Sequence, residues 1–345
     1  MTPFAAAFLV AMAVVLAVGQ SFINYMRSKK TLQPISPDAP EKHRLKHGTP
    51  TMGGILIISA VTIATVATLL LAKLDGSQKA RILLVLGAFL GAGVVGYLDD
   101  RGKAAKKENR GGLSERAKLA LQLVVAGGFV FGLTRVEQAG ITTALNLFGW
   151  HVDLGVAYYG LAILFVMGFS NAVNFADGLD GLAAGTTLIA TVALGIACSM
   201  GALFTEMLVF WGAIAGGCAA FLWFNSYPAR VFMGDTGSLA LGVGLAAGAI
   251  AAKQEVLVLI IGLIYLLEIF SMMIQRYVFK YRRIRFGLEY AQNNRVFRRA
   301  PLHHHFEELG WHETQVVGRF YVLCLIFAAV GLLIAPMLSI GGMTR

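Results

Sequence analysis

Ten apolar runs divide the chain, and each is close to the length of a helix that crosses a lipid bilayer. A membrane-spanning helix needs about 20 apolar residues, and a backbone in lipid must satisfy its own hydrogen bonds. The sequence therefore predicts an all-α membrane protein with ten transmembrane helices, in which residues 1–345 form a single integral-membrane domain. The runs lie at residues 4–26, 52–72, 82–98, 119–134, 154–176, 181–205, 207–229, 236–252, 256–275 and 320–344.

The composition supports a membrane protein. Hydrophobic residues make up 57% of the chain and charged residues 14%, whereas a soluble domain has about 45–50% apolar and about 25% charged residues. The three cysteines, Cys198, Cys218 and Cys324, lie inside apolar runs and form no CxxC pair. This placement favours small buried or lipid-facing side chains over a disulfide, redox or metal role.

Basic residues are concentrated in alternate loops, and this predicts the orientation of the helices. With the N-terminus outside, the inner segments 27–51, 101–118 and 276–319 together with Arg230 carry 23 of the 29 Lys and Arg residues. Positive charge marks the cytoplasmic side of a bacterial inner-membrane protein. We therefore expect both termini in the periplasm. The net charge of +10 is explained by membrane orientation and attraction to anionic lipid, without nucleic acid as a partner.

Five aspartates stand at the ends of apolar runs, all on the predicted inner side: Asp99, Asp100, Asp177, Asp180 and Asp235. An aspartate at the centre of a membrane helix costs roughly 2.5–3.5 kcal/mol, so these side chains belong at the interface or in a wet cleft. The pair Asp99-Asp100 is suited to holding Mg²⁺ or organising a phosphate around it. The alternative is a charged stop at the end of a helix.

A second polar group lies between two runs. Asn174, Asp177 and Asp180 are spaced i, i+3, i+6, so on a helix they would share one face. Gly178 and Gly181 would allow a ligand to approach the backbone closely. The alternative is a polar hairpin that only connects two spans.

A third group, residues 234–238, opens the eighth run with Asp235 in its first turn. The free N–H groups and positive dipole end of a helix N-terminus suit a phosphate or an Asp-bound metal. A capped helix start without ligand is the equal alternative.

Basic and imidazole side chains join these acids on the inner side. Lys46, Thr51 and Lys118 are placed to contact a diphosphate. A triplet at 303–305, all histidine, lies in the last inner segment, where imidazoles beside phosphates are at least as plausible as a zinc site. Carboxylates with Lys and His, and no thiolates, predict Mg²⁺ and phosphoryl transfer in an active-site cleft at the cytoplasmic face.

Glu268 is the one charged residue inside an apolar run. Its side chain is either a polar partner at a break or groove in the ninth helix, or a neutral or snorkelling group near the interface.

These motifs occur in the order found in a known family. Residues 48–54 (Gly-Thr-Pro-Thr-Met-Gly-Gly), Asp99-Asp100, and residues 174–181, 234–238 and 300–306 resemble those of the polyprenyl-phosphate N-acetylhexosamine-1-phosphate transferases. Pro-Leu-His-His-His is typical of the branch whose donor carries a muramoyl-pentapeptide. The chain departs from the usual pattern at Phe175-Ala176 and in the long stretch 280–299.

The resemblance implies a reaction in which undecaprenyl phosphate attacks UDP-N-acetylmuramoyl-pentapeptide, with Mg²⁺ as cofactor, and UMP is released. A related transferase with another UDP-amino-sugar donor is the alternative, and a transporter is disfavoured because transporters bind their cargo near the membrane midplane. A homodimer is the assembly expected.

The resemblance also implies roles for individual residues. Asp235 would bind Mg²⁺, with Asp99, Asp100 and His303 as further catalytic groups and Asp99 as the favoured base or organiser of the lipid phosphate. The substrate-binding residues would be Lys46, Thr51, Lys118, Asn174, Asp177, Asp180, Asn225, Phe232 (stacked on uracil), Gln275, His304 and His305.

Overall fold

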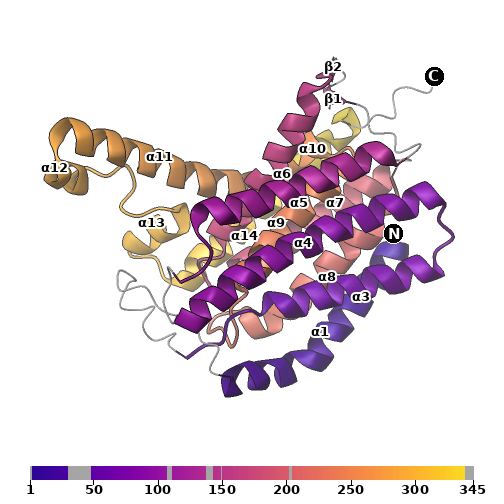
Figure 1. Ribbon diagram of the computed structural model, residues 1–345, viewed down its shortest axis with the longest axis horizontal. Coiled ribbons are helices and arrows are strands. Elements are labelled where there is room, and N and C mark those ends of the chain that lie inside the picture. Colours follow the sequence, from indigo (N-terminus) through magenta and orange to yellow (C-terminus); the bar gives the residue numbers. More distant parts are fainter. Residues whose placement is uncertain are drawn as a thin grey trace.

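The computed structural model (Figure 1) describes residues 2–29, 48–106, 111–136, 143–148, 150–201 and 204–338. Within these ranges the regular structure is helical, as predicted, apart from one short hairpin of antiparallel strands in which Ala144 pairs with Asp153. The elements are α1 (Thr2–Ser28), α3 (Gly54–Leu71), α4 (Gly76–Lys106), α5 (Glu115–Arg135), β1 (Ala144–Leu147), β2 (Trp150–Asp153), α6 (Ala157–Ala176), α7 (Leu182–Met200), α8 (Met207–Asn225), α9 (Gly234–Ala251), α10 (Glu255–Ile261), α11 (Leu263–Phe286), α12 (Leu288–Asn293), α13 (Leu302–Glu308) and α14 (Glu313–Leu338).

The expected ten spans are found if one bent pair of helices is counted as a single span. Within the described ranges, nine helices are long and apolar enough to cross a membrane, and α10 with α11 would make a tenth. These two helices are bent by 75° at a break occupied by Gly262. The run 256–275 is therefore a span only when this bent pair is counted as one, and the pair contains the kind of break that one interpretation of Glu268 placed in the ninth helix. Helix α11 also continues to Phe286 and projects from the bundle with α12 (Figure 1).

Helix α4 likewise runs further than the apolar run that predicted it. The run ends at Leu98, but the helix continues for two more turns to Lys106. Asp99 and Asp100 consequently lie inside the helix and are buried, with exposed fractions of 3% and 4%. They do not mark a helix stop, which removes that alternative.

Helix α9 is the centre of the bundle, and it packs against α3, α4 and α6. Of its 18 residues, only Gly234 and Asp235 in the first turn are not buried. Gly96 on α4 lies against the backbone of Asp235, where a Cβ atom would overlap the carbonyl of Asp235. The absence of a side chain at Gly96 lets the two helices approach closely, as small residues do in membrane bundles. This approach brings the aspartates of α4 to the start of α9.

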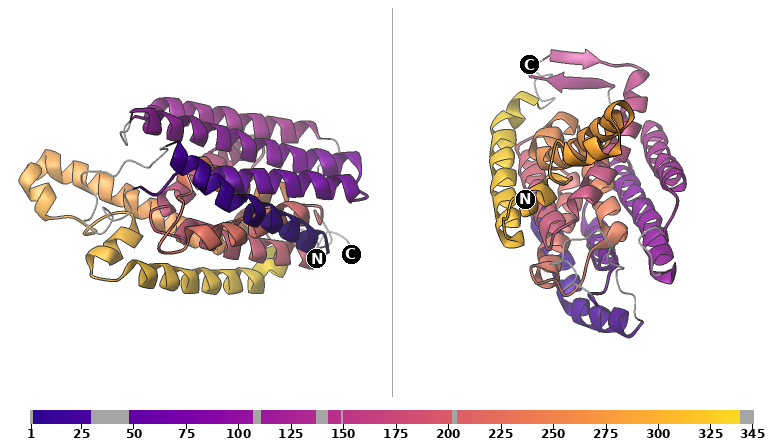
Figure 2. Two further views of the ribbon diagram at one scale, coloured as in Figure 1. Left: turned by 90° about the horizontal axis from the view of Figure 1, so that it is seen from below. Right: turned by 90° about the vertical axis from the view of Figure 1, so that its left-hand side faces the viewer.

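The described chain places the candidate-site aspartates and histidines at one end of the bundle. The C-terminal end of α4, the start of α9 and α13 lie at that end, whereas α1 begins and α14 ends at the other (Figure 2). The shared location that the sequence predicted for the aspartates and histidines therefore follows from the helix arrangement.

Candidate active site

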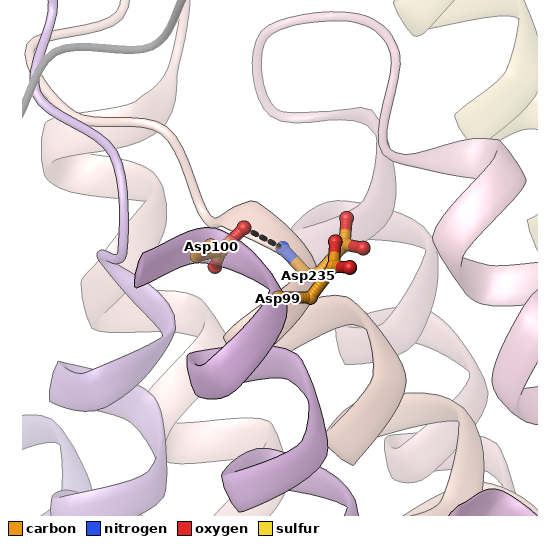
Figure 3. A group of neighbouring side chains, drawn as sticks. All are labelled: Asp99, Asp100 and Asp235. Carbon is orange, nitrogen blue, oxygen red and sulfur yellow. Dashed lines mark hydrogen bonds between the residues drawn. The ribbon is translucent and has the colours of Figure 1, made fainter. Parts of the chain in front are cut away.

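Three carboxylates form the centre of the site. Asp99 and Asp100 on α4 and Asp235 on α9 each offer an oxygen, and these three oxygens all lie within 4.8 Å of one another (Figure 3). The cluster joins residues 135 positions apart in the sequence. It depends on the close α4–α9 contact at Gly96.

The three carboxylates have different surroundings. Asp100 caps the start of α9: its Oδ1 accepts the N–H of Asp235 at 3.1 Å (Figure 3), and its Oδ2 accepts the N–H and hydroxyl of Thr236 at 2.9 and 2.7 Å. A side-chain acceptor from another helix thus satisfies donors that a helix N-terminus leaves free. Asp99 accepts the N–H of Leu113 at 2.8 Å through its Oδ1, which leaves Oδ2 facing the cluster.

Two lysines face the carboxylates. Lys103 Nζ lies 2.6 Å from Asp99 Oδ2 and 3.1 Å from Asp235 Oδ2. Lys118 on α5 contacts Asp235 Oδ2 directly and lies 3.9 Å from Asp99 Oδ2. The sequence predicted Lys118 but missed Lys103. The signal was present, because Lys103 follows Asp99 by four residues and such residues share a helix face.

The donor set fits a divalent magnesium ion. All three groups are carboxylates, and Mg²⁺ prefers hard oxygen ligands and binds through one or two carboxylates together with phosphates and water. Asp99 and Asp235 are the better candidates for direct ligands because both oxygens of Asp100 already accept hydrogen bonds from the α9 backbone. The lysines supply positive charge beside the same oxygens.

The polar stretch after α6 does not form the helical face that its spacing suggested. Helix α6 ends at Ala176, so the three side chains point to different partners. Asn174 donates to Asp235 Oδ1 at 2.9 Å and to Ser238 Oγ at 2.8 Å. Asp180 accepts the N–H of Ala229 at 2.9 Å, and its own N–H is bound by Glu313 at 2.7 Å.

Asp177 lies at the end of α6 beside the carboxylate cluster. Its burial, followed by the negative charges of Asp235 and Asp100, raises the pKa of Asp177 to about 8. A carboxyl in this position holds a proton unless positive charge is brought to the site.

The loop before α3 builds one wall of the site. The N–H of Phe232 donates to the carbonyl of Pro50 at 2.8 Å, and the N–H of Gly53 donates to the carbonyl of Phe232 at 2.8 Å. Thr51 is buried at 5% exposure, and its Oγ1 lies beside Gly234, next to Asp100. Thr51 and Phe232 are therefore brought to the cluster together.

Asn225 has a buried position between two backbone segments. Its side chain accepts the N–H of Gly181 at 3.1 Å and donates to the carbonyl of Val231 at 2.9 Å. At 3% exposure, this amide holds the turn after α6 against the segment that leads to α9.

The histidine triplet occupies the short helix α13, and its members differ. His303 is fully buried, whereas His304 and His305 are half-buried. His304 Nδ1 lies 2.7 Å from Glu307 Oε2, and His305 Nδ1 accepts the N–H of Arg298 at 3.1 Å. Gln275 on α11 accepts the N–H of Phe297 at 2.9 Å, which ties the preceding loop to α11.

The charge state of His304 follows from its surroundings. Burial lowers the pKa of His304 to about 4, although the hydrogen bond with Glu307 acts in the opposite direction. The imidazole is neutral at physiological pH. One predicted residue, Lys46, lies outside the described residues.

Two models of known protein families match the chain. Residues 82–253 match the family model Glycosyl transferase family 4, and residues 46–58 match signature 1 of phospho-N-acetylmuramoyl-pentapeptide-transferase. The first match contains all three clustered aspartates.

Proteins named phospho-N-acetylmuramoyl-pentapeptide-transferase are similar to this chain over nearly its whole length. The protein from Gemmatimonas aurantiaca is 40% identical, over 95% of this chain and 92% of its own. That from Heliobacterium modesticaldum is 42% identical, over 95% and 97%. That from Geobacillus kaustophilus is 43% identical, over 91% and 92%. The chain belongs to the phospho-N-acetylmuramoyl-pentapeptide-transferase family.

Proposed function

We propose that the protein transfers phospho-N-acetylmuramoyl-pentapeptide from its UDP donor to undecaprenyl phosphate, releasing UMP and forming a lipid-linked diphosphate sugar. The observation that carries the proposal is the cluster of Asp99, Asp100 and Asp235 with Lys103 and Lys118 against it. Carboxylates that can hold a cation, next to ammonium groups, suit a reaction whose reactants are all phosphates. Similarity to the named relatives supports the choice of donor.

Phosphoryl transfer depends on positioning and charge neutralisation rather than on covalent chemistry by the protein. Lys103 and Lys118 would bind phosphate oxygens, and Asn174 would keep Asp235 oriented through its 2.9 Å hydrogen bond. Asp99, whose Oδ2 faces the cluster, would orient the acceptor phosphate or take its proton. Thr51 and Phe232 would flank the nucleotide, with Phe232 against the uracil ring.

Asp235 and Asp99 would hold Mg²⁺, which when bound neutralises phosphate charge and polarises the bond that breaks. Asp100 would act mainly by fixing the first turn of α9. The remaining predicted residues would border the donor: Asp177, Asp180, Asn225, Gln275, His304 and His305. Three of them, Asp180, Asn225 and Gln275, would act through the loops that they hold.

The membrane arrangement is part of the proposal. The chain would be one catalytic domain in the bacterial inner membrane, with both termini in the periplasm and the cleft at the cytoplasmic face. The bias of basic residues toward the inner segments supports this orientation. A homodimer is proposed as the assembly, and mass measurement in detergent or nanodiscs tests it.

The decisive experiment measures UMP release by purified protein with polyprenyl phosphate and Mg²⁺. Release from UDP-N-acetylmuramoyl-pentapeptide is expected to be far faster than release from UDP-N-acetylglucosamine. Equal use of both donors, or preference for the simpler one, would reject the donor but leave the phosphotransferase reaction standing. No UMP release from any nucleotide sugar would reject the reaction itself and favour a transporter.

A further inference from the structure

Glu268 and His303 form a fully buried pair beside the candidate site. Each has an exposed fraction of 0%, although one lies on α11 and the other on α13. His303 Nδ1 lies 3.2 Å from Glu268 Oε2, and the His303 N–H donates to Glu268 Oε1 at 3.3 Å. One carboxylate therefore contacts both the ring and the backbone of the first histidine of the triplet.

The opposite edge of the imidazole rests on the turn that follows α6. A Cβ atom at Gly178 would overlap His303 Nε2, so the ring packs directly against the backbone at this glycine. Gly178 follows Asp177 and lies two residues before Asp180. The His303 ring thus lies between the broken span and the turn that carries two of the candidate site's carboxylates.

The contact has an electrostatic reason. A carboxylate buried in a membrane protein without a partner is very unfavourable, and such groups pair with one another or with other polar groups. In the described part of the chain, Glu268 Oε2 and both ring nitrogens of His303 make no aligned hydrogen bond. His303 therefore compensates the acid in two ways, through the hydrogen bond from its backbone N–H to Oε1 and through the 3.2 Å approach of Nδ1 to Oε2.

We propose that Glu268 is a positioning residue, which acts through His303 to hold the helix of the histidine triplet against the turn 177–181. The inference rests on the proposed function, because the helix and the turn are taken to border the nucleotide-sugar donor. His303, expected from the sequence to be catalytic, would not touch substrate, because it is fully buried. His304 and His305, which are not fully buried, are the members of the triplet that face it.

The proposal fixes the tautomer of His303. A carboxylate only accepts hydrogen bonds, so the ring nitrogen next to Glu268 carries the proton, and this nitrogen is Nδ1. Nitrogen NMR of protein with ¹⁵N-labelled histidine, assigned with His303→Gln, is expected to show a protonated Nδ1. A signal for neutral His303 with its proton on Nε2 would overturn the pairing. This measurement needs no activity, so it separates failure of the pair from failure of the proposed function.

Two substitutions of His303 distinguish a role of Nδ1 from a role of Nε2. The side-chain nitrogen of asparagine occupies roughly the place of Nδ1, and that of glutamine the place of Nε2. If the contact with Glu268 is what positions the helix, His303→Asn retains more donor turnover than His303→Gln. The reverse order would overturn the proposal, because it would assign the function to Nε2.

Kinetics with both substrates separate positioning from general stability. Glu268→Gln is expected to raise KM for the nucleotide-sugar donor about tenfold, as small displacements of binding groups do, while KM for polyprenyl phosphate stays unchanged. The effect should vanish in a His303→Gln background, since interacting residues are non-additive. Additive effects, or an equal rise in both KM values, would overturn the proposal.

Glu255 provides the matched control. It is a second buried acid of the same broken span, at 8% exposure, but it pairs with Lys253 at 2.8 Å and with Tyr158 at 2.5 Å. It begins α10, far from α13 (Figure 1). Glu255→Gln is expected to lower the thermal midpoint without changing the KM for the donor. A donor KM raised as much as by Glu268→Gln would show that any buried acid of the span has this effect, against the proposal.

Discussion

Asp100 Oδ2 accepts two hydrogen bonds from Thr236, one from its N–H at 2.9 Å and one from its hydroxyl at 2.7 Å. An acid of one membrane helix thereby caps the first turn of another. Replacing such a cap with alanine costs about 0.5–2 kcal/mol of stability. We expect Asp100→Ala to lower the thermal midpoint of the purified protein, and Thr236→Val to lower it less because the backbone contact remains. An unchanged midpoint for Asp100→Ala would contradict the capping role.

Asp235→Asn is expected to abolish UMP release at every Mg²⁺ concentration while expression and detergent behaviour stay normal. The amide keeps the shape of the side chain but loses the negative charge that faces Lys103 and Lys118 and that would bind a cation. Turnover titrated against Mg²⁺ measures the effect. Asp153→Asn in the exposed strand β2 is the control and should behave as wild type. Activity of Asp235→Asn within a few-fold of wild type would exclude Asp235 as a metal ligand.

The number of membrane spans and the shared end of the aspartates and histidines could be predicted from the sequence because both follow from local patterns. Apolar length identified the spans, and the carboxylates lay at their ends. A break in this helix was one interpretation of Glu268, but its position at Gly262 could not be predicted, since the apolar run continues through it. The partner of Glu268 could not be predicted either, because His303 is 35 residues further along the chain and no local pattern connects the two.

The sequence predicted which types of residue gather at the candidate site better than it predicted where their side chains point. The spacing of Asn174, Asp177 and Asp180 suggested one helical face, but α6 ends at Ala176 and tertiary partners decide where each side chain points. Lys103 was missed because a lysine beyond an apolar run resembles an ordinary cytoplasmic charge. Its helix continues to Lys106, and this continuation turns Lys103 toward Asp235.

The neutral state of His304 gives a prediction about pH. Burial lowers its pKa to about 4, with Glu307 opposing the shift and His303 and Arg299 adding to it. Because the group stays neutral between pH 6 and 8, His304→Gln should reduce turnover by the same factor at each pH in this range. A change in the shape of the pH profile would show that His304 titrates during turnover.

The lowered pKa of His304 also affects the stability of the folded protein at lower pH. The pKa of His304 has its ordinary value of 6.5 in the unfolded chain and is lowered to about 4 in the folded protein. Stability should therefore fall as the pH drops through this window. Thermal midpoints at pH 7.5 and 5 should differ more for wild type than for His304→Gln.

Topology can be tested with reporter fusions. The concentration of 23 of the 29 basic residues in the predicted inner segments predicts that a periplasm-active reporter fused after Arg345 is active and that one inserted within 101–115 is silent. The polar end of the bundle, which contains the aspartates, would then face the cytoplasm. The reverse pattern of activities would place the cleft on the periplasmic side, away from cytoplasmic nucleotide sugars.

Lys103 would compete with a cation bound at the cluster, because its ammonium group contacts the same carboxylate oxygens. Its Nζ lies 2.6 Å from Asp99 Oδ2 and 3.1 Å from Asp235 Oδ2, so bound Mg²⁺ and the ammonium group repel each other. Lys103→Met should therefore strengthen the apparent affinity for Mg²⁺. It should also slow turnover at saturating Mg²⁺ about tenfold or more, because a positive charge that neutralises phosphate is lost.

Lys106, exposed in the last turn of the same helix, provides the control, and Lys106→Met should change neither quantity. Mg²⁺ titrations of UMP release for both variants measure the two effects. If Lys103→Met weakened Mg²⁺ binding and slowed turnover together, the lysine would be supporting the metal site rather than competing with it. If turnover were unaffected, phosphate neutralisation would rest on Lys118, which contacts Asp235 from α5.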